Sequence, residues 1–304
     1  MQFHISRTFY YGHKKNIPFI SPVILKLKEM IMPLFTIDKE KCAKDSLCAL
    51  DCPMQIIAIN RETGIPEPSP HAENLCINCG HCVAICPKAA FSLKTMGPDD
   101  CEKTAKNWNP GEEVIGNYLK ARRSIRKFKD DPVEKEKVEK LISIAAYAPT
   151  GHNSRTAEWM VIQGRAKVKE LAAEVITWMK DMETSSPDIA KMMHFDMMIK
   201  AWAFNIDVIT HNCPTVIISH GLKLHPATSQ SCTIAMSHLE IAAPSLGLGC
   251  CWGGFLAWCA SSWKPMREKL GLPENHNVYG TMLIGYPKFR YARAPKREAK
   301  IIWK

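Results

Sequence analysis

The amino-acid sequence predicts a globular protein that mixes helices and strands and is divided into two modules. Three observations carry this prediction. Seven of the 13 cysteines lie between Cys42 and Cys86, strand and helix patterns alternate after residue 117, and a polar stretch with two prolines separates the two parts at residues 96–116. A chain of 304 residues with 46% hydrophobic residues is long and apolar enough for about two domains.

The charge of the chain is unevenly distributed. The net charge is +10, and the basic excess lies mainly in the second module, whereas the cysteine-rich part is close to neutral. Such an excess suits an anionic cofactor or an acidic protein partner. Because the sequence contains no recognised nucleic-acid motif, we expect no nucleic-acid partner.

The first element is an N-terminal extension, residues 1–33. Its apolar run at 17–25 follows Lys14 and Lys15 and faintly resembles a signal peptide. Two prolines interrupt the run, lysines follow it, and no small-residue cleavage site is present, so we predict neither a signal peptide nor a membrane span. The extension is either an amphipathic docking segment or sequence upstream of a start at Met32. We expect a cytoplasmic protein.

The second element, residues 34–95, contains the run CINCGHCVAICP at 76–87. Its cysteine spacing resembles the bacterial ferredoxin signature, in which three cysteines bind one iron–sulfur cluster and the fourth, before proline, binds the other. Thiolates suit this role because cluster iron prefers soft anionic sulfur ligands. Paired cysteine spacings also bind zinc, and a zinc knot is the alternative interpretation. Zinc, however, accounts poorly for two runs that both end in Cys-Pro.

The run CAKDSLCALDCP, residues 42–53, has the same register but carries Asp45 at the second cysteine position. The resemblance implies two 4Fe-4S clusters with crossed ligands. Because a carboxylate is a harder and weaker ligand than a thiolate, we expect an exchangeable iron beside Asp45, and a 3Fe-4S cluster is an alternative there. A decayed site is the other interpretation. The two ligand sets are Cys76, Cys79, Cys82 and Cys52, and Cys42, Cys48 and Cys86 with Asp45.

The third element, residues 96–116, is a polar connector, and the fourth, residues 117–304, is the larger module. This module opens on the basic run RRSIRKF at 122–128. Its three arginines and a serine could bind a phosphate through charge-assisted hydrogen bonds, and the alternative interpretation is a solvated helix face. Periodicity then predicts further elements. They are a helix opened by Asp131 and Pro132 with Val138, Leu141, Ile142 and Ala145 on one face, a strand at 158–164, a helix at 166–181 with Leu171, Val175 and Trp178 on one stripe, a strand at 214–221, a helix end entering a turn at 245–254, and a strand at 282–287.

The order of these motifs, with APTGHNSR at 148–155 between the first helix and the first strand, resembles the nitroreductase family of FMN-dependent oxidoreductases over about residues 115 to 300. The absence of a GxGxxG turn agrees with it, since this family does not bind its flavin through a Rossmann turn. The resemblance implies an α+β fold, with an antiparallel sheet flanked by helices, and a homodimer with FMN at the subunit interface. It implies that Arg122, Arg123, Ser124 and Arg126 contact the FMN phosphate and ribityl region, that Asn153 contacts the ring edge, that Trp252, Gly253 and Gly254 lie against the ring, and that Arg297 contacts the phosphate.

Together the two modules predict an oxidoreductase in which ferredoxin, or another low-potential one-electron donor, supplies electrons through the clusters to FMN. The expected acceptor is a small molecule such as a nitroaromatic, a quinone or an activated double bond. We expect no essential acid–base side chain, with Arg126 as a candidate for stabilising charge. Two alternatives stay open: reductive dehalogenation on the same scaffold, and an electron relay or redox sensor without small-molecule turnover.

Overall fold

The computed structural model describes residues 33–304, so nearly all of the predicted N-terminal extension lies outside the described residues. Contacts divide the chain into two compact parts between Lys103 and Thr104, which we call unit 1 and unit 2. This division falls inside the predicted connector. Among the described residues, no helix is both long and apolar enough to cross a membrane.

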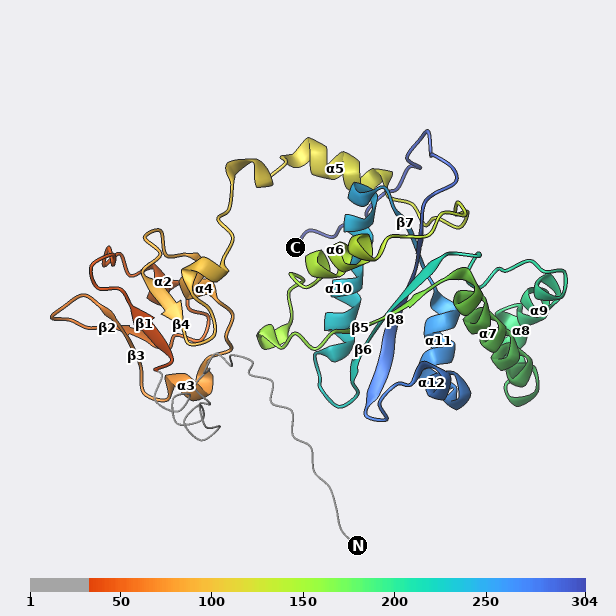
Figure 1. The fold of residues 1–304 in the computed structure, drawn as a ribbon, viewed down its shortest axis with the longest axis horizontal. Coiled ribbons are helices and arrows are strands. Elements are labelled where there is room, and N and C mark those ends of the chain that lie inside the picture. Colours follow the sequence, from red (N-terminus) through yellow and green to blue (C-terminus); the bar gives the residue numbers. More distant parts are fainter. Residues whose placement is uncertain (1–32) are drawn as a thin grey trace, which may run out of the picture. The chain divides into compact units, whose positions relative to one another are not determined.

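Unit 1 is built from two small antiparallel sheets and three short helices (Figure 1). One sheet pairs β1 with β4 and the other pairs β2 with β3. The rings of Phe35 and Phe91, 4.6 Å apart, join β1 and β4 in the core. The elements are β1 (Phe35–Ile37), α2 (Leu47–Leu50), β2 (Ile57–Ile59), β3 (Pro66–Pro68), α3 (Ala72–Leu75), α4 (His81–Ala84) and β4 (Phe91–Leu93).

The backbone of unit 1 repeats itself at one constant offset in sequence. Helix α4 follows α2, and strand β4 follows β2, at the same distance along the chain. Three residues with positive φ in the first half recur at this offset in the second half. The two cysteine loops therefore share one backbone conformation, although Asp45 replaces a cysteine in the first. The recurring pairs are Lys44 with Asn78, Ser46 with Gly80, and Gln55 with Ala89.

Unit 2 contains a four-stranded sheet in the order β5-β6-β8-β7, in which every neighbouring pair is antiparallel. Successive residues point to opposite faces, so Val216 and Ile218 enter one core cluster while Ile217 enters the other. The sheet is thus buried on both sides. Its strands are β5 (Glu158–Gln163), β6 (Thr215–Leu222), β7 (Gly249–Trp252) and β8 (His276–Gly285).

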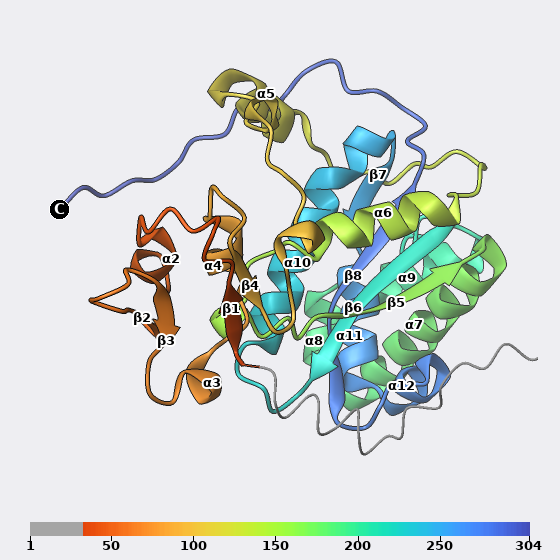
Figure 2. The ribbon, with the colours of Figure 1, turned by 60° about the vertical axis from the view of Figure 1, so that its left-hand side comes forward.

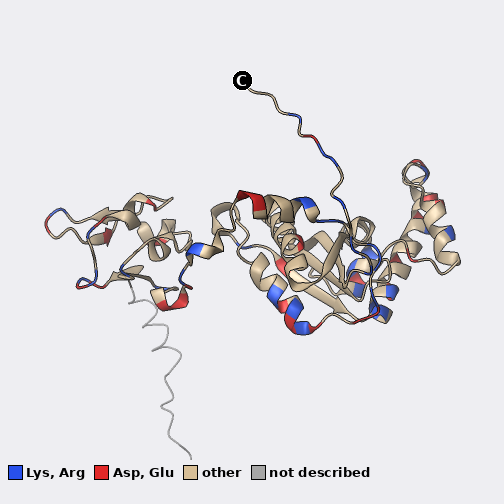
Figure 3. Ribbon diagram, turned by 90° about the horizontal axis from the view of Figure 1, so that it is seen from above, with Lys and Arg blue, Asp and Glu red and all other residues tan. Residues whose placement is uncertain are grey.

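Helices cover both faces of this sheet (Figures 1 and 2). Buried side chains of α7, α9, α11 and α12 pack on one face, and those of α6 and α10 pack on the other. This is the predicted α+β arrangement of an antiparallel sheet flanked by helices. The helices of unit 2 are α5 (Glu112–Ala121), α6 (Lys135–Ala145), α7 (Arg165–Ser185), α8 (Pro187–Met192), α9 (Phe195–Ala203), α10 (Thr228–Ala242), α11 (Gly254–Ser262) and α12 (Lys264–Leu270). Figure 3 shows Lys and Arg in blue and Asp and Glu in red on helices and loops of the ribbon.

The basic run RRSIRKF follows the edge of the sheet beside β7. Ser124 forms a parallel bridge with Cys250, and the Ile125 N–H donates to the Cys250 carbonyl at 2.8 Å. The Ile125 side chain lies 2.6 Å from the point where a Cβ on Gly249 would stand, so glycine permits this close approach. The run is therefore held against the sheet and is not a solvated helix face.

Two sequence-based expectations are wrong in part. Residues 245–254 hold the predicted helix end and glycine turn only at their start, where Gly247 at φ +74° ends a short 3-10 helix, because strand β7 occupies Gly249–Trp252. The predicted helix opened by Asp131 and Pro132 begins only at Lys135, since the carbonyl of Val133 accepts a 3.0 Å hydrogen bond from Gln163 of β5. The first difference comes from the pairing of β7 with β8, and the second accompanies a side-chain hydrogen bond from a distant strand.

Candidate functional site

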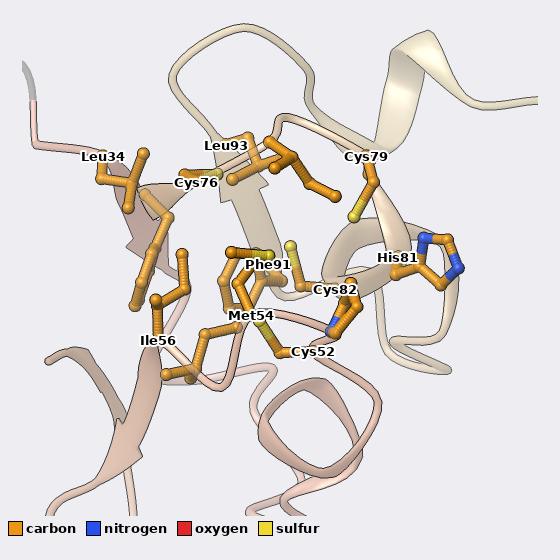
Figure 4. A pocket seen from close by; sticks show the side chains of 15 residues that line it. Leu34, Cys52, Met54, Ile56, Cys76, Cys79, His81, Cys82, Phe91 and Leu93 are labelled. Carbon is orange, nitrogen blue, oxygen red and sulfur yellow. The ribbon is translucent and has the colours of Figure 1, made fainter. Parts of the chain in front are cut away.

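The first candidate site is a cavity in unit 1 lined by four cysteines. Cys76, Cys79 and Cys82 come from the loop and helix around α4, and Cys52 follows α2. Their sulfur atoms point toward one another inside the cavity (Figure 4). The remaining wall is largely apolar, with Met54 and Phe91 among its side chains. Four converging thiols in an apolar cavity fit a tetrahedral set of sulfur ligands.

A second cavity in unit 1 brings together Cys42, Asp45, Cys48 and Cys86. The residues of each predicted ligand set thus line one cavity, with Cys52 and Cys86 crossed between the halves. The Asp45 Oδ1 accepts a 3.1 Å hydrogen bond from the N–H of Leu47. This contact holds the Asp45 carboxylate at the N-terminus of α2, the helix that carries Cys48. The other carboxylate oxygen, Oδ2, is then the one that could bind a metal.

Burial changes the chemistry of these thiols. It raises the pKa of Cys48, and it raises the pKa of Cys82 to about 12. Both groups alone are therefore neutral thiols near pH 7. A bound metal centre of high positive charge would be needed to hold them as thiolates, which is the usual coupling between metal binding and deprotonation.

The third candidate site is a cavity of about 540 Å³ in unit 2, which is partly open to solvent. It joins four predicted residues, Arg126, Trp252, Gly253 and Gly254. A Cβ on Gly253 would meet Thr281 Oγ1 at 2.6 Å, whereas one on Gly254 would meet no atom within 4 Å. Gly253 is therefore required by strand packing, while Gly254 leaves open space beside the cavity. The other lining residues are Met193, Val208, Ile209, His211, Cys251, Phe255 and Trp258.

A buried carboxylate that sequence reasoning missed lies between two of the predicted residues. Glu240 of α10 is 9% exposed. Its Oε1 accepts from Arg122 at 2.8 Å, and its Oε2 accepts from the Trp252 indole N–H at 3.0 Å. Arg122 is thus paired with a buried carboxylate through its Nη1, and its contact with the FMN phosphate stays a prediction. The one sequence signal was an acidic residue among the apolar residues of a helix, in SHLEIAA.

Arg123, unlike Arg122, has no carboxylate partner among the described residues. Its Nη1 donates to the carbonyl of Arg122, but its Nε is buried and, among the described residues, has no hydrogen-bond partner. A buried guanidinium N–H without an acceptor is costly, which makes this group a candidate for binding an anion. A phosphate oxygen would satisfy it.

Five of the predicted residues do not line the unit 2 cavity, namely Arg122, Arg123, Ser124, Asn153 and Arg297. Asn153 lies in a short 3-10 helix, Gly151–Asn153, where its Oδ1 accepts from Arg155 Nε at 3.3 Å. Arg297 lies in the exposed segment after β8, which has no helix or strand. Neither residue lines the cavity that contains Arg126.

Burial is the main cause of the pKa shifts of the titratable groups in the cavity. It lowers the pKa of His211, although the nearby carboxylate of Asp207 opposes this shift. It raises the pKa of Cys251, against the effect of Arg126, and it also raises the pKa of the neighbouring Cys250, which does not line the cavity. Both thiols are therefore neutral near pH 7 and are poor nucleophiles.

Comparison with known proteins places the resemblance in unit 2. The model of the nitroreductase family matches residues 119–286. A protein of Archaeoglobus fulgidus named as a putative NADH dehydrogenase/NAD(P)H nitroreductase is 27% identical over 177 residues, 58% of this chain and 87% of its own length. Similar structures are a nitroreductase with bound FMN from Bacteroides fragilis (TM-score 0.51, 23% identity, 61% of this chain and 94% of that one) and one from Desulfitobacterium hafniense (TM-score 0.51, 19%, 64% and 100%). At this identity, these two structures show the fold.

Proposed function

This chain belongs to the nitroreductase family, and we propose that it is an FMN-dependent oxidoreductase that draws its electrons through two iron–sulfur clusters in unit 1. The observation that carries the proposal is the pair of cavities lined by Cys52, Cys76, Cys79 and Cys82 and by Cys42, Asp45, Cys48 and Cys86, in the same chain as the family fold. Both ligand sets match the crossed arrangement of a two-cluster ferredoxin.

The residues of unit 2 support a flavin phosphate and ring in this proposal. Arg126 brings a guanidinium to the cavity, and Arg123, three residues earlier in the basic run, offers a buried N–H without an acceptor among the described residues. Trp252 and the two glycines after it form one wall of that cavity. Glu240 holds the Trp252 indole in place. When bound, FMN accepts electrons singly and releases them in pairs, which is the conversion that a cluster-fed enzyme needs.

The proposed source of electrons differs from the one in the relatives' names, which is NAD(P)H. The Archaeoglobus protein is named for NAD(P)H, and its alignment occupies 87% of its length, which leaves too little of it for a module like unit 1. We propose that unit 1 takes the place of NAD(P)H here and accepts electrons from a ferredoxin or another one-electron donor. A cytoplasmic location would suit this role, because reduced thiols persist there.

The proposed partner of unit 2 is a second copy of the chain. Helix α5 buries none of its residues, and Val114, Ile115 and Leu119 are 61%, 41% and 45% exposed. Apolar side chains that gather on one exposed helix mark an interaction surface. The acceptor is proposed to be a planar organic molecule, since Phe255 and Trp258 give the cavity an aromatic wall.

Anaerobic purification with iron, acid-labile sulfide and FMN quantified tests the proposal directly. We expect FMN on denaturation and about seven to eight irons per chain. Reduced ferredoxin should then reduce the flavin faster than NAD(P)H does. Absence of flavin would refute the FMN assignment, and rapid reduction by NAD(P)H alone would refute the cluster route. Full reduction without turnover of nitroaromatics, quinones or enones would favour an electron relay.

A further inference from the structure

Three potential metal ligands lie at one end of the unit 2 sheet, away from the sites described above. Glu158 begins β5, His220 lies near the end of β6, and His276 begins β8. These three strands are neighbours in the sheet. The unit 2 cavity lies farther along β8, where Trp252 pairs with Met282. Met282 and His276 are six positions apart along the strand, or about 20 Å.

A β-bulge brings the three side chains to one face of the sheet. Glu158 pairs directly with His220, which gives these two a common face. In the pairing of β6 with β8, Ser219 opposes Gly280 but His220 opposes Val278, so Tyr279 is the extra residue. His276 lies two positions before Val278 and shares its face. Bulges often re-aim a side chain in this way.

The distances between the side chains fit a single ion. The Nδ1 atoms of His220 and His276 are 3.1 Å apart, and the His276 Nε2 lies 3.7 Å from the Glu158 Oε1. One ligand atom from each residue lies within 4.8 Å of the others. These two contacts use different nitrogens of His276, and an ion would be bound through one of them. Ligand atoms that now lie up to 4.8 Å apart would have to approach to about 3.3 Å, the separation in a tetrahedral site with bonds of about 2.0–2.2 Å. The alternative explanation is a hydrogen bond between two imidazoles.

Burial separates the two kinds of ligand. His220 and His276 are each 7% exposed, whereas the Glu158 side chain is 58% exposed. An ion could therefore enter from solvent beside Glu158 and meet two imidazoles held inside. Two imidazole nitrogens and one carboxylate are ligands that suit Zn²⁺, with a fourth position left for water.

We propose that Glu158, His220 and His276 bind one Zn²⁺ ion, which ties together the ends of strands β5, β6 and β8. The ion would require both imidazoles in their neutral form, each with a nitrogen lone pair turned to the metal. This site depends neither on the flavin nor on the iron–sulfur clusters.

The test is a titration of the full-length, metal-depleted protein with ZnCl₂, followed by calorimetry and zinc analysis. The variants are His220→Gln and Glu158→Gln, and His238→Gln on α10 is the matched control. Wild type and control should bind one more Zn²⁺ per chain than His220→Gln. Glu158→Gln should weaken that site by at least about 100-fold, the upper end of what loss of a mere supporting group costs. Zinc bound by the cysteines of unit 1 cancels in this comparison.

Titration with CoCl₂ identifies the ligands. The spectrum of the Co²⁺ ion that wild type binds and His220→Gln does not is obtained as the difference between the two proteins. It should show visible bands without the strong charge-transfer absorption that thiolate ligands give. Equal metal binding by wild type and both variants would overturn the proposal and leave a hydrogen-bonded histidine pair. If His220→Gln does not unfold cooperatively, the exposed Glu158→Gln variant decides the outcome alone.

Discussion

Arg122 and Glu240 form a 2.8 Å ion pair although 118 positions separate them in the sequence. Glu240 also accepts from the Trp252 indole, so one carboxylate joins the basic run at the sheet edge to the wall of the unit 2 cavity. The first arginine of that run therefore has a structural partner within the protein, whereas Arg123 has a buried N–H without an acceptor among the described residues and Arg126 lines the cavity.

Replacing Glu240 tests this link. Glu240→Ala leaves Arg122 without a counter-charge and the Trp252 N–H without an acceptor. Because the Arg122 side chain is 30% exposed, we expect a loss of about 1–3 kcal/mol in the free energy of unfolding, measured by urea denaturation. The matched control is Glu139→Ala, which breaks an exposed pair with Lys135 and should cost at most about 0.5 kcal/mol. Similar losses in the two variants would contradict the role given to Glu240.

Arg123→Gln removes the buried guanidinium N–H proposed for the FMN phosphate. A charge-assisted hydrogen bond contributes about 1.5–3 kcal/mol, so the dissociation constant of FMN should rise by about 10-fold or more. Fluorescence titration of the apoprotein measures it. Arg293→Gln, in the exposed C-terminal segment, serves as the control. The same titration on Arg297→Gln tests the predicted contact of Arg297 with the FMN phosphate. If this variant binds FMN as tightly as the Arg293→Gln control, that contact is not made.

Crossed ligation predicts which half each cysteine serves. Cys52→Ser should damage the cluster of Cys76, Cys79 and Cys82, although Cys52 belongs to the first run. We expect iron and acid-labile sulfide to fall by about half, with the remaining spectrum that of the Asp45 site. Cys101→Ser is the control, because that thiol lines neither cavity. Zinc in place of iron, without sulfide, would exclude clusters altogether.

Asp45→Cys should convert the second cavity into an ordinary four-cysteine site. Its iron should then resist oxidative loss better than in the wild type, because a thiolate binds cluster iron more strongly than a carboxylate. Electron paramagnetic resonance before and after air exposure distinguishes three-iron from four-iron clusters. Iron content and spectra identical to the wild type would mean that Asp45 is not a ligand.

His211 makes the folded chain sensitive to acid. Burial lowers the pKa of this imidazole below its ordinary value of about 6.5, so the unfolded chain binds the proton first as pH falls. Stability should therefore decrease as pH falls through about 6.5 and level off below the folded pKa. His211→Asn should show a shallower decrease in urea midpoint between about pH 7.5 and 5. His152→Asn, at an exposed position with φ 51°, should behave as the wild type.

Much of the fold follows from local pattern. The stripe of Leu171, Val175 and Trp178 predicts the buried face of α7, and all three side chains are buried in the structure. Val138, Leu141 and Ala145 do the same for α6. These predictions succeed because a helix shows its buried face at a fixed period along the chain. The resemblance of the two cysteine runs to the ferredoxin signature likewise implies which cysteines share a cavity.

The rest depends on contacts between distant segments. Strand β7 carries four residues and has no alternating pattern, so only its pairing with β8 defines it. Glu240 is an ordinary acidic residue in the sequence, and its role emerges only when α10 faces Arg122. His220 and His276 are brought together by a bulge in β8. No sequence pattern in β6 or β8 predicts this bulge.

The edge position of the basic run has a consequence for solubility. Strand β7 is the last strand of its sheet, and an uncovered edge is a template for pairing with other chains. Ser124 and Ile125 occupy part of that edge. A variant that frees this segment would expose an apolar strand of two cysteines and a tryptophan. The segment proposed to bind the cofactor would thus also guard the protein against aggregation.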